Sequence, residues 1–365
     1  MPHIVGHLSA ASTFREWGIF LLHTARQEQT NKRLKEFAMF DRVLVALDRS
    51  DRTENILPHV QTVACAFASH IDLVHVFDKG SHEIAVDPLD WYMERGKVQA
   101  QLSYLYEQLL DSSLPADSVL LDGAAPDRIL AYAEESAASL IVLNHGAHRR
   151  LTGRVARKVA SRARQSLLVV HDGPRGRSRR NARGAYRRIL VPLDGSRRAE
   201  HVLPAATALA QQCQATLVLA RVVTPPQRIG TRGTLEAPAS EKAASQLMAR
   251  NCQEAHDYLD QVQSQLAVPA ETRLISGDPI AGLRQLSHEE GADLVLLSAH
   301  GYGCRKQQPY GRVASAFLYE GDTSLLLVQD VPAHEIGVSP AERAAQAAGQ
   351  QAARRHTTAP TISFH

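Results

Sequence analysis

The sequence has few of the residues and patterns that mark the more specialised protein classes. It holds four cysteines among 365 residues, with no Cys-x-x-Cys pair and no histidine spacing typical of zinc, which speaks against a disulfide scaffold or a zinc domain. No apolar run approaches the roughly 20 residues of a membrane-spanning helix, and the first residues lack the basic start and cleavage site of a signal peptide. These absences predict a cytoplasmic protein with no membrane segment and no metal site.

The sequence also lacks a strong excess of positive or negative charge, and it lacks the common catalytic motifs. The net charge of +3 gives no sign of a nucleic-acid partner. The sequence contains no phosphate-binding P-loop, no nucleophile elbow and no His-Glu-x-x-His metal pair. It also lacks the Ser-Gly-Gly-x-Asp-Ser and His-Ile-Gly-His motifs of adenylating enzymes that share a similar sheet. We therefore predict that the protein is not an enzyme and has no catalytic residue.

An internal repeat organises the chain. The segment RVLVALDRS at residues 42–50 recurs as RILVPLDGS at 188–196. Further along, SLIVLNHG at 139–146 parallels DLVLLSAHG at 293–301, and SLLVV at 166–170 parallels SLLLV at 324–328. Similar segments that recur in the same order indicate two copies of one domain.

Within each copy, apolar and helical segments alternate. The short segments are continuous runs of Val, Leu and Ile, typical of parallel strands buried on both faces. Amphipathic stretches at 54–68, 91–110, 200–212 and 240–266 predict helices between them. We predict an α/β fold of two tandem doubly wound, Rossmann-like parallel-sheet domains, with ligands at the carboxyl ends of the strands where the strand order reverses.

Composition predicts the domain boundaries. The domains span 39–172 and 188–330, and the Gly- and Arg-rich segment 173–187 reads as a solvated linker, with nucleic-acid binding as the less favoured alternative. Met39 directly precedes the first strand, so residues 1–38 form an extension that is either disordered or, if translation starts at Met39, non-native. Residues 331–365 carry no core-forming pattern and predict a disordered tail.

The clearest candidate site lies in residues 293–330. An apolar strand there runs into a polar loop containing Gly301, and Gly311 opens a helix before the final strand. Glycine allows a backbone to turn sharply or to approach a phosphate, and helix N-terminal amides bind anions. The segment therefore predicts an anion-binding loop.

Taken together, these repeated motifs make residues 39–330 resemble a tandem universal stress protein. The resemblance implies a fold like that of the adenine nucleotide alpha hydrolases and a cytoplasmic role in the stress response. It also implies that the two domains pair through their last strands, at 166–170 and 324–328. Whether two chains form a homodimer is left open.

The resemblance also implies a nucleotide site in the second domain. The ATP-binding branch of the family has a loop pattern of Gly-x-x-Gly, nine residues, then Gly followed by Ser or Thr. Gly301 and Gly311 keep that spacing, but Ser298 replaces the first glycine and Arg312 replaces the small hydroxyl residue. The implied ligand is ATP with Mg, or a related adenine nucleotide, with at most slow hydrolysis. The implied site residues are Pro192, Asp194, Val222, Leu297, Ser298, Gly301, Gly311, Arg312 and Val313.

The first domain departs further from the pattern, since only six residues separate its two loop glycines. We expect a degenerate site there, with the weaker candidates Asp48, Val76, Gly146 and Gly153. Four alternatives stay open. Gly301 and Gly311 could simply be turn glycines. The strand-end aspartates Asp48 and Asp194 could cap the following helices, and His300 is expected to be a structural hydrogen-bonding group rather than a catalytic one. The whole chain could also be a regulatory or scaffold protein that binds no nucleotide and folds as an internal pseudo-dimer.

Overall fold

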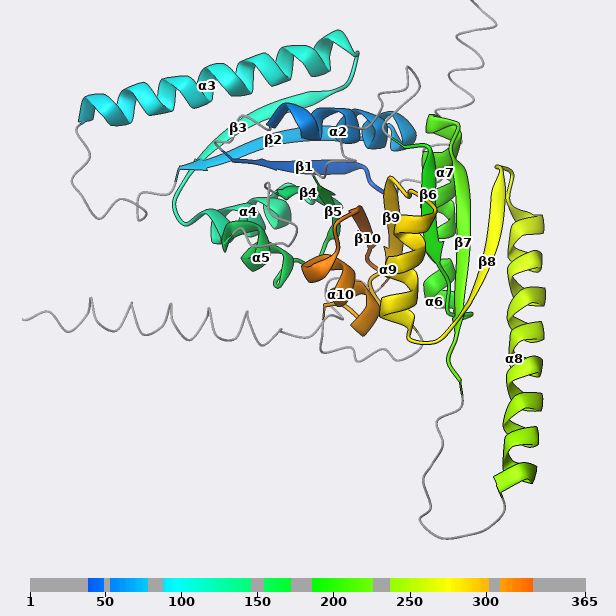
Figure 1. Ribbon diagram of the computed structural model, residues 1–365. Coiled ribbons are helices and arrows are strands. Elements are labelled where there is room, and N and C mark those ends of the chain that lie inside the picture. Colours follow the sequence, from blue (N-terminus) through cyan, green and yellow to red (C-terminus); the bar gives the residue numbers. More distant parts are fainter. Residues whose placement is uncertain are drawn as a thin grey trace, which may run out of the picture. The chain divides into compact units, whose positions relative to one another are not determined.

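The computed structural model describes residues 39–48, 53–77, 88–145, 154–171, 186–225, 237–301 and 309–330. Within them, both repeats contribute to one ten-stranded sheet with the strand order β3-β2-β1-β4-β5-β10-β9-β6-β7-β8 (Figure 1). The predicted extension 1–38, the predicted tail 331–365 and all but two residues of the predicted linker lie outside the described residues.

The first repeat alternates strands and helices as predicted. Its strands are β1 (Arg42–Leu47), β2 (His70–Phe77), β3 (Ala116–Asp122), β4 (Leu140–His145) and β5 (Ser166–His171). Its helices are α2 (Thr53–Phe67), α3 (Pro88–Asp111), α4 (Ala125–Glu135) and α5 (Arg154–Ala160). Every strand pair within this repeat is parallel.

The second repeat has the same layout. Its strands are β6 (Arg188–Pro192), β7 (Thr216–Val223), β8 (Ala270–Ser276), β9 (Leu294–Ser298) and β10 (Ser324–Val328), again paired in parallel. Its helices are α6 (Arg197–Glu200), α7 (Leu203–Cys213), α8 (Ala237–Gln265), α9 (Pro279–Glu289) and α10 (Arg312–Glu320). The single helix predicted at 200–212 is in fact two, α6 and α7. Pro204 lies in the first turn of α7, a position that suits proline because the N–H it lacks would have no partner within the helix.

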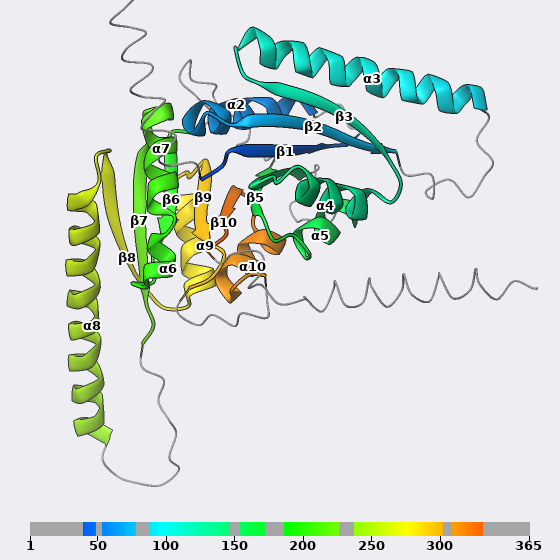
Figure 2. The same ribbon diagram turned by 180° about the vertical axis from the view of Figure 1, so that it is seen from behind.

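Helices cover both faces of the sheet (Figures 1 and 2). On one face, α4, α5, α9 and α10 pack on a single hydrophobic core that draws strand residues from both repeats. On the other face α2 and α7 contact each other across the repeats, while α3 and α8 cover the outer strands. The central strands are almost wholly buried, as their apolar runs predict, whereas the edge strands β3 and β8 are partly exposed.

The two repeats join where β5 and β10 pair in the antiparallel direction. Each end of this seam is closed by a matching hydrogen bond. The Gln329 N–H donates to Ser166 Oγ at 3.0 Å, and the His171 N–H donates to Ser324 Oγ at 3.1 Å. The predicted pairing of the last strands is confirmed.

A second contact between the repeats lies at the end of the predicted linker. Tyr186 is buried, and its hydroxyl lies 2.9 Å from Nδ1 of His59 on α2. Burial lowers the pKa of His59 to about 4. The prediction of a fully solvated linker is therefore wrong at this end, because Tyr186 is an aromatic anchor between the repeats. No described helix is long and apolar enough to cross a membrane.

Candidate functional site

The strand order reverses between β6 and β9. From β6 the sheet continues to β7 and β8, and from β9 it continues to β10. Because both strands are parallel, their carboxyl ends meet at one edge, and such a switch point leaves room for a ligand between the two following loops. Asp194 follows β6 and Gly301 follows β9, so two predicted site residues lie at this point.

Asp194 and Gly301 are in direct contact. A Cβ atom placed on Gly301 would overlap Oδ2 of Asp194, so glycine is required here by the close approach of the carboxylate. The other oxygen, Oδ1, accepts a hydrogen bond from the Ser196 N–H at 2.9 Å. Ser196, not Asp194, caps α6, through a hydrogen bond from the Ala199 N–H to its Oγ at 3.2 Å. The helix-capping alternative for Asp194 is therefore wrong.

The N-terminus of α10 adjoins the same loop. Gly311 is the N-cap, its N–H donates to the Ala299 carbonyl at 2.7 Å, and as a glycine it has no side chain with which to cap the helix. In contrast, Asp278 caps α9 with its own carboxylate. A Cβ on Gly311 would lie 3.9 Å from the Gly301 nitrogen and would clash with nothing, so this glycine is not sterically required. Among the described residues, no side chain is recorded as an acceptor for the first-turn amides of α10, and such helix termini can bind anions.

The two departures from the family pattern also adjoin this edge. Ser298, the last residue of β9, is 8% exposed, and its Oγ has no hydrogen-bond partner in the part of the chain that the structure describes. Arg312 is exposed, in the first turn of α10, and forms no ion pair with another described residue. A cation there opposes the helix dipole, although it could pair with a bound anion.

The apolar site residues lie in the sheet or against its core. Pro192 is opposite Ala220 on β7, and Leu297 is opposite Leu327 on β10. Val222 and Val313 are partly buried and pack against the hydrophobic core. The structure thus brings Asp194, Gly301 and Gly311 together.

A buried polar chain links the loops after β9 and β10. His300 Nδ1 lies 2.7 Å from Asp330 Oδ1, and Arg198 of α6 contacts the other carboxylate oxygen at 3.0 Å. Burial alone would raise the pKa of Asp330, but the hydrogen bond and charge of His300, aided by Arg198, hold it below its usual value. These contacts agree with a structural role for His300. Sequence reasoning missed Asp330 and Arg198, because nothing in the sequence brings residues so far apart together.

Sequence reasoning also missed an arginine beside Asp194. The guanidinium carbon of Arg221, on β7, lies 4.9 Å from the ring centroid of Tyr258 on α8. The Tyr258 hydroxyl donates to Glu200 Oε1 at 2.9 Å, and burial together with this bond raises the pKa of Tyr258 above its usual value. A Cβ on Gly195 would lie 3.1 Å from Arg221 Nη2. The cation therefore lies over the turn that follows Asp194.

The first repeat presents only part of its predicted site. Asp48 is exposed directly after β1, and Val76 packs partly buried against the core. Asn144 occupies the position equivalent to Ser298, and its side-chain amide atoms are buried without hydrogen-bond partners among the described residues. Gly146 and Gly153 lie outside the described residues.

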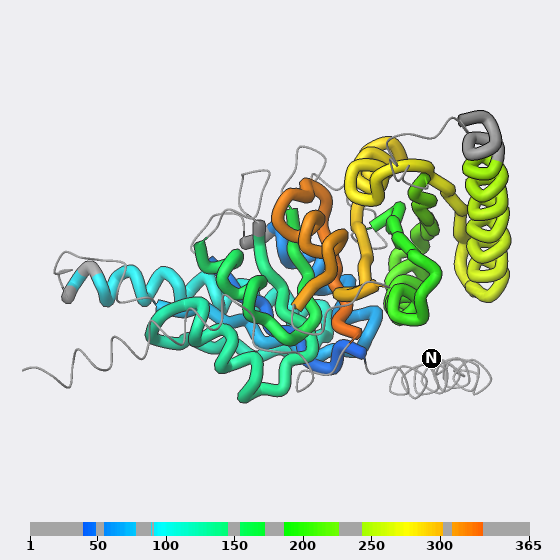
Figure 3. The backbone as a smooth tube through the Cα atoms, turned by 90° about the horizontal axis from the view of Figure 1, so that it is seen from below, coloured from blue at the N-terminus to red at the C-terminus, as the bar shows by residue number. Residues whose placement is uncertain are grey.

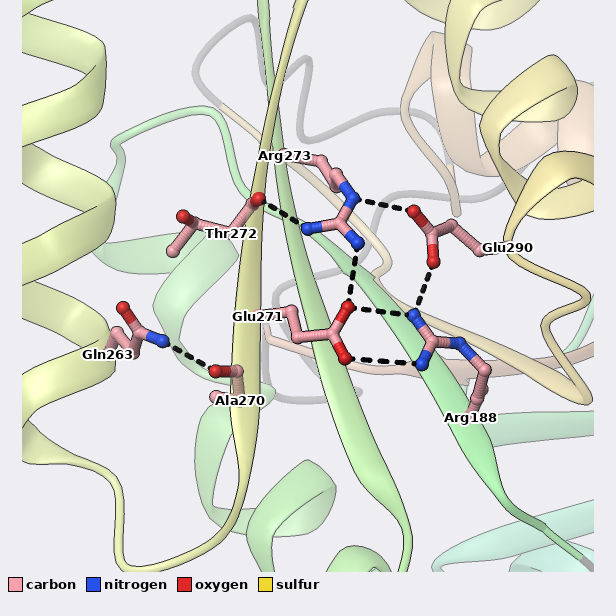
Figure 4. Close-up of polar contacts among 7 residues, drawn as sticks. All are labelled: Arg188, Gln263, Ala270, Glu271, Thr272, Arg273 and Glu290. Carbon is pink, nitrogen blue, oxygen red and sulfur yellow. Dashed lines mark hydrogen bonds and ion pairs between the residues drawn. The ribbon is translucent and has the colours of Figure 1, made fainter.

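The opposite, amino-terminal edge of the second repeat holds a network of ion pairs (Figure 4). Arg188 contacts Glu271 at 3.0 Å and also pairs with Glu290, while Arg273 contacts Glu271 at 2.7 Å and Glu290 at 2.5 Å. Every charge has an opposite partner, so the network fixes β6, β8 and the end of α9 rather than offering a binding site.

The corresponding edge of the first repeat gathers His70, Asp72 and Asp117 within metal-ligand distance of one another. Arg42 contacts both oxygens of the buried Asp72, at 2.6 and 2.9 Å. The buried carboxylate of Asp72 is thus neutralised by Arg42, the first residue of β1, which corresponds to Arg188, the first residue of β6. We interpret both clusters as ion pairs that hold the strands.

Comparisons with known proteins agree with the two-repeat fold. The model of the universal stress protein family matches residues 39–171 and 185–329. No curated protein gives a significant match. Among solved structures, a functionally unknown protein from Pseudomonas aeruginosa PAO1 is 15% identical, with a TM-score of 0.59, 85% of this chain covered and 99% of the other. A universal stress protein from Archaeoglobus fulgidus is 14% identical, with a TM-score of 0.52, 80% of this chain covered and 99% of the other.

A second structure from Archaeoglobus fulgidus, a universal stress protein in complex with dAMP, is 23% identical over 36% of this chain and 98% of the other. Its TM-score of 0.29 is too low to support inferences about this chain. At these identities the solved structures establish the fold alone. The two family matches, which together cover most of the chain, establish that this protein belongs to the universal stress protein family and carries the family domain twice.

Proposed function

We propose that the protein is a cytoplasmic stress-response regulator whose second domain binds an adenine nucleotide at the carboxyl edge of β6 and β9. The observation that carries this proposal is the contact between Asp194 and Gly301 beside the N-terminus of α10, whose N-cap is a glycine. It combines an acceptor for hydroxyl groups with helix N-terminal amides that can donate to an anion, at a topological switch point.

The phosphate end of the nucleotide belongs at α10. The first-turn amides there can donate to phosphate oxygens, and exposed Arg312 supplies a positive charge in place of the hydroxyl found in the family pattern. A bound Mg²⁺ would offset the charge of a triphosphate. Val313 lies in the same turn of α10.

The nucleoside end extends from α10 toward β6 and β7. Asp194 would accept hydrogen bonds from the ribose, near Leu297 and the hydroxyl of Ser298, and Val222 would contact the adenine. The buried Ser298 Oγ has no partner among the described residues, and a hydrogen bond from a ligand would remove the cost of burying it unpaired.

Isothermal titration of the full chain with ATP-Mg and with AMP tests the proposal. We expect about one site per chain. Asp194→Ala should weaken binding by about tenfold or more, since hydrogen bonds to a charged group contribute roughly 1.5–3 kcal/mol. The equivalent substitution Asp48→Ala locates the site. If it weakens binding and Asp194→Ala does not, the ligand is in the first domain, and the absence of heat at millimolar nucleotide would refute the proposal.

A second candidate function is a regulatory scaffold that binds no nucleotide. Two observations favour it: Arg312 opposes the dipole at the proposed phosphate position, and the internal β5–β10 pairing already supplies a complete pseudo-dimer. Restoring the family pattern with Ser298→Gly and Arg312→Ser distinguishes the two. A scaffold would gain nucleotide binding only in the double variant, whereas the proposed binder shows it in the natural sequence.

A further inference from the structure

Among the described residues, Arg221 has no partner for its charge, unlike the other partly buried arginines of the second repeat. Arg188 and Arg273 pair with Glu271 and Glu290, and Arg198 pairs with Asp330. No carboxylate in the described part of the chain lies within ion-pair distance of Arg221, and its guanidinium makes no hydrogen bond there. A partly buried cation without a counter-ion is costly, and a planar guanidinium can offer paired donors to an oxyanion.

The guanidinium is nevertheless held in place. It stacks over the Tyr258 ring, with 4.9 Å between its central carbon and the ring centroid, and the Tyr258 hydroxyl is fixed by Glu200. Gly195 has a φ of +83°, and a Cβ at that position would lie 3.1–3.3 Å from the three nearest guanidinium atoms. Stacking contributes orientation without using the N–H donors. The side chain is therefore positioned before any ligand arrives, and no described residue occupies its N–H donors.

The order of the strands places this cation relative to the rest of the site. The α10 N-terminus lies by the loop after β9, Asp194 follows β6, and Arg221 is on β7, which are three successive strands of the sheet. Neighbouring strands are about 4.8 Å apart, so Arg221 is roughly two strand spacings from the proposed phosphate position. Asp194 directs Oδ2 toward Gly301, on the β9 side, and Arg221 lies on the β7 side. The carboxylate and the guanidinium thus occupy different parts of the site.

We propose that Arg221 binds a second anionic group of the ligand, on the ribose side, so that the second domain prefers a nucleoside bisphosphate with a phosphate on the ribose 2′ or 3′ oxygen. This inference rests on the proposed nucleotide site. A 5′-phosphate would occupy the α10 N-terminus, Asp194 would accept from the free ribose hydroxyl, and Arg221 would contact the phosphate on the other oxygen. In doubly wound sheets an Asp or Glu contacts a free ribose hydroxyl, and where the ribose carries a 2′-phosphate an Arg nearby accommodates it.

Titration calorimetry of the full chain with AMP, adenosine 2′,5′-bisphosphate, adenosine 3′,5′-bisphosphate and GMP tests the inference. In the natural protein we expect one of the two bisphosphates to bind at least about tenfold more tightly than AMP, and the two arms tell which oxygen carries the phosphate. Arg221→Gln should bring the ratio of the two dissociation constants close to one. Arg221→Lys should restore only part of it, because an ammonium group lacks the paired donors. The control for net charge is Arg250→Gln, which should keep the ratio: Arg250 is exposed, lies on the same helix as Tyr258 and pairs with Glu254.

The outcomes separate this inference from the proposed function. Binding of AMP without any advantage for a bisphosphate would refute the inference and leave the nucleotide site standing. A tighter binding of the bisphosphate that survives Arg221→Gln would also refute the inference. So would a preference for GMP over AMP that Arg221→Gln abolishes, because the guanidinium would then contact the O6 and N7 acceptors of guanine. Absence of binding by all four compounds would refute the proposed function itself.

Discussion

His59 should make the junction between the two repeats sensitive to acid. Its imidazole is buried on α2 with Nδ1 2.9 Å from the Tyr186 hydroxyl, and burial lowers its pKa from 6.5 to about 4. The unfolded chain therefore takes up a proton near pH 6.5, while the folded chain resists protonation until about pH 4. Stability contributed by neutral His59 is thus complete above pH 6.5 and is lost as the pH falls toward 4.

The size of the loss follows from the pKa difference. One pKa unit corresponds to about 1.4 kcal/mol, so His59 should cost about 1 kcal/mol of unfolding free energy at pH 5.5 and about 3 kcal/mol once the pH is near 4. His59→Gln retains a group able to hydrogen-bond to Tyr186 but does not titrate. Urea denaturation of both proteins between pH 7.5 and 4.5 isolates the contribution, because the other titrating groups are shared. The stability difference between the two proteins should move in favour of the variant as the pH falls. Parallel pH profiles would refute the reasoning.

Two further perturbations test the site. Gly301→Ala should destabilise the protein by about 1–3 kcal/mol in urea unfolding, and it should weaken ATP binding more than Gly311→Ala does. The reason is that only Gly301→Ala places a Cβ against Asp194. Equal effects of the two substitutions would contradict the contact between Asp194 and Gly301. Asp330→Asn should cost about 1–3 kcal/mol at pH 7 by removing the charge beside His300. Since the folded pKa of Asp330 is held below 3.8, this difference should persist down to that range and shrink only as the pH falls through the folded value. A difference already gone at pH 5 would show that Asp330 is not ionised in the fold.

Much of the fold could be predicted because it depends on local patterns. Continuous apolar runs identify buried parallel strands, and the repeat identifies the two copies. The pairing of β5 with β10 was expected from the family resemblance, and the structure has it. The Leu-Pro pair shows where prediction from the sequence reaches its limit. In the first repeat Pro58 lies inside one continuous helix, α2, whereas in the second repeat Pro204 lies in the first turn of α7. Tertiary packing, which one sequence does not reveal, decides between these two outcomes.

The candidate site was only partly predictable. Asp194, Gly301 and Gly311 stand at strand ends and a helix start, and position in the repeat is enough to select them. Arg221 and Tyr258 could not be selected in this way, because they lie on elements separated by a long segment and meet only when α8 packs on β7. Figure 3 shows α10 (orange) among elements of both repeats. Such neighbours are set by how the strands assemble into one sheet.

Native mass spectrometry of the full chain with ATP or AMP measures the central claim most directly, because it counts bound nucleotide per chain. We expect one adenine nucleotide per chain in the natural protein, loss of that species in Asp194→Ala, and its retention in Asp48→Ala. A nucleotide-free spectrum at saturating concentration, or a bound species that persists in Asp194→Ala, would contradict it.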